Sequence, residues 1–324
     1  MMTRTLTATR PGPVALSVDL PAGDIRVITD PDRMVAEITV TTLGDDPAVD
    51  DAVRGAFLHN NEPAGELTVR VRPPSGGVTI VGGTQTVIGN RGAMVVQSFG
   101  DIGAGVTANG AVISGDGIVS IGDRVGGRVV VNGVEVTGGG IVGGHVQITA
   151  QLPEGSSVAA VTRSAPLRCE GELAAVAFTS TSGDLSAGGV AALRAKTTSG
   201  DIDADVVDGA AVLESVSGDV RLGRADDIRA ATTSGHVTVN DFGGDAEVTT
   251  VSGGVRVHAA EGGTITARSI SGHVTVTATG TALAEGLTVH ATSRIGHVTT
   301  PTDTPPGSAS TSRVRRPRRT SGGA

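Results

Sequence analysis

A short unit, Ser-Gly followed by Asp or His and then by an apolar residue, recurs along the second half of the chain. Full copies begin at Ser182, Ser199, Ser217, Ser234 and Ser271, a copy with Gly in the third position begins at Ser252, and a degenerate copy spans Ile295–Val298. Six successive motif glycines, from Gly183 to Gly272, are 17, 18, 17, 18 and 19 residues apart. A period of this kind is typical of repeat architectures, in which each unit contacts mainly its neighbours.

Apolar and polar residues alternate on both sides of each motif. Val237 and Val239 follow one motif glycine, and Ala246 and Val248 precede the next. This alternation predicts short strands with one face inward, and a single unit cannot bury that face without stacked neighbours. The inward residues are small, in keeping with a chain that has four Phe and neither Trp nor Tyr. We therefore predict an all-β fold, a β-solenoid-like stack with about 17–18 residues per repeat over 146–300.

Residues 1–74 are predicted to add strands to the same β fold, together with one short helix over 47–58. Asp46 suits the N-cap of that helix and Pro47 suits its first position. The apolar residues that share one helical face are Val49, Ala52, Val53, Ala56 and Phe57. The helix should therefore cover part of the apolar core.

Two further segments differ in composition from the repeats. Residues 75–145 alternate Gly with short Val/Ile runs, and Asn132-Gly133 between two such runs favours a hairpin turn. Neither GxxxxGK(S/T) nor a GxGxxG that opens a helix, the two glycine motifs that bind phosphate, is present there. We therefore attribute the glycines to backbone geometry and predict a Gly-rich β-hairpin insertion. Residues 301–324 combine Pro, Gly, Ser, Thr and Arg, and we expect a disordered Arg-rich tail.

The net charge of −8 is divided unevenly along the chain. The tail contains Arg313, Arg315, Arg316, Arg318 and Arg319. The remaining chain is therefore strongly acidic, which argues against nucleic acid as a ligand of the folded body. The tail arginines themselves have three interpretations: a weak electrostatic tether to a membrane surface or nucleic acid, a contact with an acidic partner, or simple solvation.

No stretch of the sequence has the length and apolarity of a membrane span, and the N-terminus lacks an apolar signal region. A cytoplasmic location is therefore expected, with peripheral attachment to a membrane left open. The single cysteine, Cys169, cannot form an internal disulfide, and no active-site signature surrounds it. We expect it to be structural.

The spaced Ser-Gly-Asp and Ser-Gly-His units, preceded by the segment Leu152–Val158, resemble a bacterial family of unknown function. Its members are described as adhesin-type, β-strand-repeat or toastrack domains. The resemblance covers 147–299, and Ala22–Val27 fits the same fold. It implies a stacked β-repeat and a role in the cell envelope or in stress sensing. It supplies no catalytic residues.

Stacked units would place the residue after each motif glycine in one column, with neighbouring coils about 4.7–4.9 Å apart. This repeat-turn column consists of Asp184, Asp201, Asp219, His236, Gly254, His273 and His297. Carboxylates and imidazoles at that spacing could bind a metal or respond to pH, whereas Asp and His also suit solvent-facing turns. One Asp per repeat does not match calcium-binding β-rolls. We therefore interpret the column as structural, a weak metal candidate, and predict no metal and no cofactor.

The signatures of serine hydrolases, zinc proteases and dithiol redox sites are missing from the sequence, so we predict that the protein is not an enzyme. The expected function is a scaffold or protein-interaction module with an unidentified protein partner, and the resemblance adds a link to envelope stress or regulation. Self-association is left open. Two alternatives remain: a metal- or pH-responsive sensor that uses the repeat-turn column, and a surface adhesin, which would require export.

Overall fold

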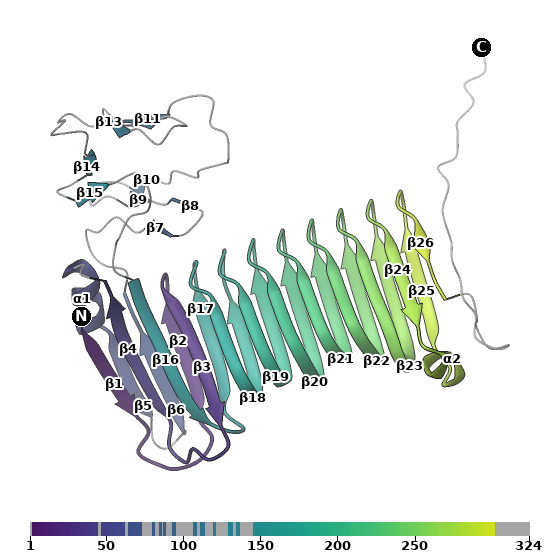
Figure 1. The fold of residues 1–324 in the computed structure, drawn as a ribbon, viewed down its shortest axis with the longest axis horizontal. Coiled ribbons are helices and arrows are strands. Elements are labelled where there is room, and N and C mark those ends of the chain that lie inside the picture. Colours follow the sequence, from purple (N-terminus) through teal and green to yellow (C-terminus); the bar gives the residue numbers. More distant parts are fainter. Residues whose placement is uncertain are drawn as a thin grey trace.

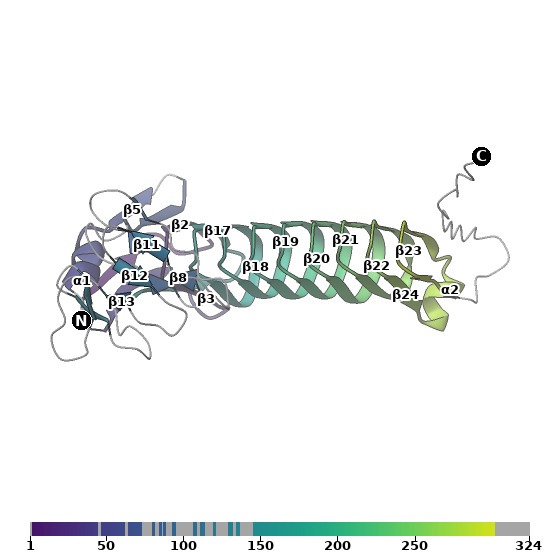
Figure 2. The same cartoon turned by 90° about the horizontal axis from the view of Figure 1, so that it is seen from above.

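The computed structural model describes residues 2–44, 47–61, 64–72 and 145–301, together with short strand segments between Ile80 and Val136. The long described part forms two facing β-sheets joined along both long edges (Figure 1). Seen from above, the coils follow one another as regular rungs (Figure 2). The predicted all-β stacked repeat is confirmed.

Each repeat is one long strand bent at its middle. These strands are β18 (Leu167–Thr179), β19 (Leu185–Thr197), β20 (Ile202–Ser215), β21 (Val220–Thr232), β22 (Val237–Thr250) and β23 (Val255–Ser269). Every strand pairs in parallel with the next, and the register shifts near each bend. The first halves form sheet 1 and the second halves form sheet 2. We call the bent side the corner edge and the side with the Ser-Gly motifs the turn edge.

The N-terminal strands complete both sheets. Sheet 1 begins with β1 (Thr3–Thr7), β4 (Glu37–Leu43), β16 (His145–Pro153) and β3 (Asp24–Asp30), which pairs with the first half of β18. Sheet 2 begins with β5 (Phe57–Asn61), β6 (Glu66–Arg70), β2 (Ala15–Leu20) and β17 (Ser157–Thr162), which pairs with the second half of β18. Strands from before and after the insertion therefore interleave within one stack.

The C-terminal coil replaces the bend by a helix. β24 (Val274–Ala278) extends sheet 1, and α2 (Gly280–Ala284) then crosses the corner edge. β25 (Thr288–Ser293) continues sheet 2, and β26 (Val298–Thr299) returns to sheet 1. The Thr279 hydroxyl caps α2 by accepting the N–H of Ala282, whose side chain is buried.

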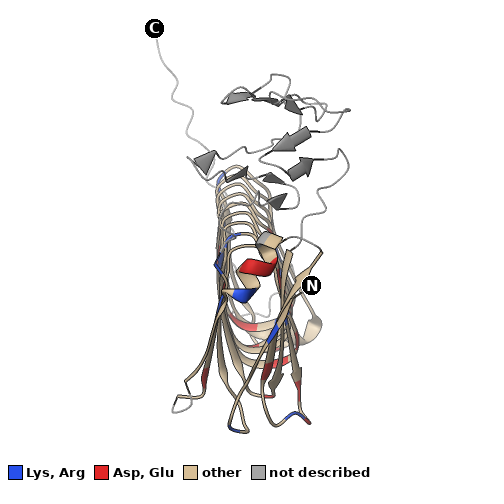
Figure 3. Ribbon diagram, turned by 90° about the vertical axis from the view of Figure 1, so that its left-hand side faces the viewer, with Lys and Arg blue, Asp and Glu red and all other residues tan. Residues whose placement is uncertain are grey.

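The N-terminal end of the stack is covered by α1 (Pro47–Arg54), which lies across the opening between the sheets (Figure 3). The helix packs its own residues Val49, Ala52 and Val53 against the core, where they are buried. The predicted helix over 47–58 is wrong beyond residue 54, and Phe57 instead begins β5 opposite Arg70.

The helix ends early because Gly55 is a poor helix former and because pairing with β6 provides the following residues with another set of backbone hydrogen bonds. The side chain of Phe57 is consequently 53% exposed. The predicted cap, Asp46, lies outside the described residues.

In the segment predicted as a hairpin insertion, the residues that the structure describes between Ile80 and Val136 form short strands. They are β7 (Ile80–Val81), β8 (Thr84–Gln85), β9 (Val87–Ile88), β10 (Ala93–Met94), β11 (Val106–Ala108), β12 (Ala111–Ile113), β13 (Val119–Ser120), β14 (Val129–Val131) and β15 (Val134–Val136). β14 and β15 pair antiparallel, with Val131 opposite Val134. The remaining residues of 73–144 and the tail 302–324 lie outside the described residues.

The motif glycines are required by the close approach of neighbouring coils. A Cβ on Gly218 would lie 1.9 Å from the carbonyl oxygen of Gly200, and the same contact recurs at 1.7–2.2 Å for the motif glycines from Gly183 to Gly296. Distances this short exclude any side chain, because the obstructing atom belongs to the backbone of the preceding coil. Glycine therefore sets how tightly the coils stack at the turn edge.

Replacement of Gly218 by Ala should destabilise the protein by about 3 kcal/mol or more, because neither coil can move without breaking its ladder. Gly280→Ala is the matched control, since nothing lies within 4 Å of its added Cβ. Urea unfolding followed by circular dichroism measures both. Equal stability of the two variants would show that the coils separate easily.

Candidate functional site

The structure brings the repeat-turn column together at the turn edge. The N–H groups of Leu185, Ile202 and Val220 donate to the carbonyl groups of Asp201, Asp219 and His236, respectively, at 2.8–2.9 Å. This ladder places each column residue beside its equivalent in the next coil. The predicted alignment of Asp184, Asp201, Asp219 and His236 is therefore what the backbone shows.

The carboxylates of the column accept backbone hydrogen bonds from the following coil. Asp184 Oδ1 accepts the N–H of Asp201 at 2.9 Å. Asp201 Oδ1 accepts the N–H of Asp219, and Asp219 Oδ1 that of His236, both at 2.8 Å. Hydrogen bonds to a charged acceptor are stronger than neutral ones. These Asp side chains therefore join one coil to the next.

A single arginine offsets the charge of two of these carboxylates. Arg221 Nη2 lies 2.9 Å from Asp219 Oδ2, and Arg221 Nη1 lies 3.6 Å from Asp201 Oδ2. His236 Nδ1 is 3.5 Å from Asp219 Oδ1. All of these groups are substantially exposed, so each pair contributes little stability. Their main effect is to reduce repulsion along the column.

The column ends in a pair of stacked histidines. The rings of His273 and His297 are 5.3 Å apart with an interplanar angle of 7°. The N–H of His297 donates to Nδ1 of His273 at 3.0 Å. That bond requires a neutral ring with its proton on Nε2, since a protonated imidazole has no acceptor nitrogen. This end of the column therefore depends on the protonation state of His273.

In the part of the chain that the structure describes, no group of three or more His, Cys, Asp or Glu side chains is arranged to hold a metal ion. Cys169 lies on β18, where its side chain faces the core between the sheets and is 4% exposed. Burial raises the pKa of its thiol to about 12. The reactive thiolate is therefore scarce at neutral pH.

A second column, which the sequence analysis did not identify, lies buried beneath the first. The residue three positions before each motif glycine carries a hydroxyl, and it accepts the N–H of that glycine at 2.8–3.1 Å. Its members are Ser180, Thr197, Ser215, Thr232, Thr250, Ser269 and Ser293. The sequence signal that could have identified this column is the Ser or Thr that recurs three positions before each motif glycine. Its role is to satisfy a buried N–H group.

An exposed row of β-branched residues, the turn ridge, runs along the same edge. It consists of the residues two positions before the motif glycines, namely Thr181, Thr198, Val216, Thr233, Val251 and Ile270. Carbonyl groups of the ridge accept N–H groups from the next coil, as Val251 does from Ser271 at 2.9 Å. Its three apolar side chains, Val216, Val251 and Ile270, are 39–47% exposed. The sequence analysis missed this row because alternation alone does not distinguish turn positions from strand positions.

The remaining predicted site residues are the tail arginines Arg313, Arg315, Arg316, Arg318 and Arg319, which lie outside the described residues. Within the described ranges, no helix has the length and apolarity needed to cross a membrane.

A protein-family model described as Toastrack DUF4097 matches residues 15–316. The match begins at the first residue of β2 and includes the whole repeat, so the resemblance found in the sequence is confirmed. No curated protein matches the chain significantly.

Lowering the pH from 7.5 to 5.5 should loosen the contact between His273 and His297. Protonation of His273 would remove the acceptor, because the bond to the His297 amide exists only with a neutral ring. We expect the protection of that amide from hydrogen exchange, corrected for the intrinsic rate, to fall about fivefold, the factor for a bond of about 1 kcal/mol.

His273→Asp is the control for this experiment, because its carboxylate would accept the same amide at both pH values, as Asp184 does for Asp201. Protection in the wild-type chain that does not change with pH would contradict the assigned tautomer.

Proposed function

The chain belongs to the Toastrack DUF4097 family, and from that premise we propose that it is a non-enzymatic scaffold that binds a protein partner along its turn ridge. The observation that carries the proposal is the exposed apolar row in the C-terminal half of the ridge. Val216, Val251 and Ile270 are 47%, 39% and 45% exposed, and Ile295, one position further along the last turn, is 76% exposed. Large apolar side chains aligned on a surface are typical of interaction sites.

The stack gives this row a fixed geometry. Ridge residues belong to turns whose N–H and carbonyl groups bond to both neighbouring coils, as Ser234 does to Val216 and Ser252 to Thr233, each at 2.8 Å. The side chains therefore repeat at about the strand spacing of 4.7–4.9 Å. The scaffold is already ordered before a partner binds. Binding a partner that matches this spacing would therefore cost little of the scaffold's conformational entropy.

The non-enzymatic part of the proposal is supported by the contacts of the polar side chains. Asp184, Asp201 and Asp219 accept backbone hydrogen bonds, and the buried Ser/Thr column accepts the motif N–H groups. Cys169 is a buried core residue. The polar groups that most resemble chemical machinery therefore have structural roles.

A second candidate function, a pH-responsive sensor, is favoured by the bond between His297 and His273, which depends on a neutral ring. Protonation would also place two positive charges in rings 5.3 Å apart. The metal-binding form of this sensor has no comparable support among the described residues.

The cellular role that we infer is in envelope stress or its regulation, with the protein in the cytoplasm and attached peripherally to the membrane. The support for this role is the family membership together with the five arginines of the tail. Five positive charges without an apolar anchor would give weak, salt-sensitive attachment to anionic lipid.

Replacing Val216, Val251 and Ile270 together by Ser should remove partner binding without unfolding the chain, because all three side chains are exposed. A photoreactive residue at Thr233, between two of them, reports binding by crosslinking in the cells that make the protein. We expect the crosslink yield to fall at least about tenfold, since each lost apolar contact is worth about 1 kcal/mol.

The matched control replaces the hydroxyl members Thr181 and Thr198 of the same ridge by Ser, which leaves its apolar part intact. Crosslinks of equal yield in both variants would show that the apolar row is not the binding surface.

Truncation after Thr300 removes the tail arginines, and a share of the full chain should sediment with membranes while the truncated chain stays in the supernatant. Fractionation at low and at high salt measures this, and high salt should release the full chain. Identical distributions of the two chains would rule out the tail as a tether.

A further inference from the structure

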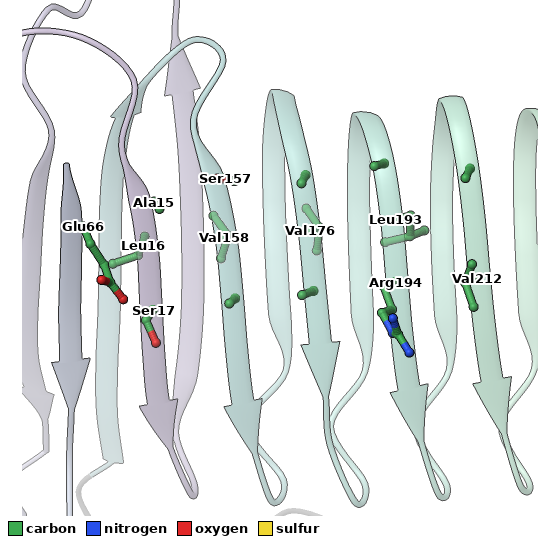
Figure 4. A pocket seen from close by; sticks show the side chains of 15 residues that line it. Ala15, Leu16, Ser17, Glu66, Ser157, Val158, Val176, Leu193, Arg194 and Val212 are labelled. Carbon is green, nitrogen blue, oxygen red and sulfur yellow. The ribbon is translucent and has the colours of Figure 1, made fainter. Parts of the chain in front are cut away.

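The outward surface of sheet 2 is hollowed into a shallow groove over its N-terminal strands (Figure 4). The groove has a volume of about 440 Å³ and crosses β6, β2, β17, β18, β19 and β20. Its floor is made of small side chains, among them Ala15, Ser157, Ala159, Ala175, Ala177 and Ala192. The surface is therefore both apolar and nearly free of projecting side chains.

The same sheet provides an internal comparison. In the row that contains Ala175 and Ala192, Ala210 lies opposite Asp227, which in turn lies opposite Asp245. In the next row, Val212 is followed by Arg229 and Glu247. Alanine is a poor strand former on an exposed face, where the later coils carry charged residues. The N-terminal half of this face thus has the composition of a contact surface.

Two residues of opposite charge line the groove four strands apart. Glu66 lies on β6 and Arg194 on β19, four strands further along the order β6, β2, β17, β18, β19. Both side chains line the groove (Figure 4). Neither belongs to an ion pair seen among the described residues.

Ion pairs border the groove on its turn-edge side. Arg70 Nε lies 3.1 Å from Asp19 Oδ2, and Lys196 Nζ lies 2.8 Å from Glu214 Oε2. Lys196, with a smaller contribution from Arg194, holds the pKa of Glu214 below its ordinary value. An apolar floor with a charged rim is the usual anatomy of a protein interface.

We propose that this groove binds the same groove of a second copy of the chain, about a two-fold axis that runs parallel to the strands over β17. Such an axis places β6 of one copy over β19 of the other, and β2 over β18. Glu66 then lies opposite Ala192 of the other copy and two residues along the strand from Arg194, about 7 Å, which the two long side chains can span to form an ion pair; two-fold symmetry forms this pair twice.

A second copy is the occupant that the charges favour, because opposite charges two strands to either side of β17 make this part of the groove complementary to itself. The small side chains of the floor let the two sheets approach closely, and Ser157 and Ala159 pack at the axis against their own equivalents. The groove and the turn ridge are different surfaces. This inference therefore goes beyond the proposed scaffold function and does not depend on it.

The test is the oligomeric state of the full chain, measured by sedimentation equilibrium over about 1–100 μM. We expect a dimer, and Ala177→Arg, which places a charge on the groove floor, should weaken it at least tenfold. The matched control is Ala231→Arg, on the same face of sheet 2 but on β21, beyond the groove, and it should leave the dimer unchanged.

A charge exchange tests the pairing itself. Glu66→Arg and Arg194→Glu should each weaken the dimer, and the double variant should restore it to within about threefold, because the ion pair is reformed with its charges reversed. All four substituted side chains are exposed, so circular dichroism and the melting temperature should stay at wild-type values. That check separates loss of the interface from loss of the fold.

Three results would overturn the proposal. The first is a chain that remains monomeric at the highest concentration, which would leave the groove to another segment of the chain or to another protein. The second is a dimer that tolerates Ala177→Arg. The third is a double charge variant as weak as the single ones. The turn-ridge variants should dimerise normally, so failure here leaves the proposed function intact.

Discussion

The close approach of successive coils at the turn edge is the constraint on which the rest of the structure depends. Each motif glycine lies against a carbonyl group one coil earlier, that of Ala165 for Gly183 and that of the preceding motif glycine for the others, at a distance that excludes a Cβ. The motif N–H group is thereby buried, and a Ser or Thr hydroxyl three residues earlier accepts its hydrogen bond. Glycine and hydroxyl residue act as a pair, because the first permits the approach and the second satisfies the polar group that it buries.

A fixed spacing at the turn also determines what the two sheets can contain. The strands leave the turns in register, and their inward residues form one continuous core in which the side chains of Phe178 and Phe242 are the largest. Such a stack needs covers at its ends, where apolar side chains and backbone groups would otherwise face water. α1 covers the N-terminal opening, and α2 covers the corner of the last coils.

The same geometry changes how the polar residues of the repeat are interpreted. Carboxylates stacked at the strand spacing resemble a cation site in sequence, yet in the structure Asp184, Asp201 and Asp219 each accept an amide from the next coil. Their negative charge is used in backbone hydrogen bonds and in contacts with Arg221. The two surfaces that we propose for binding, the turn ridge and the Ala/Ser groove of sheet 2, are built from side chains that point away from the core. Function in this fold therefore depends on which side chains the ladder leaves outward.

The sequence alone determined the repeat, its period, the alternation within each strand and the position of the Ser-Gly turns, because these depend on contacts between residues about one period apart. Only the tertiary structure showed that β16 lies between β3 and β4, since that pairing joins residues more than a hundred positions apart across the insertion. The early end of α1 was decided in the same way, by the pairing of Phe57 with Arg70 in β6. The alanines of the groove are ordinary exposed positions in sequence. They become one surface only after the register sets Ala15, Ser157, Ala175 and Ala192 side by side. Local spacing thus encodes the coil, whereas order between distant strands is decided by which edges remain free to pair.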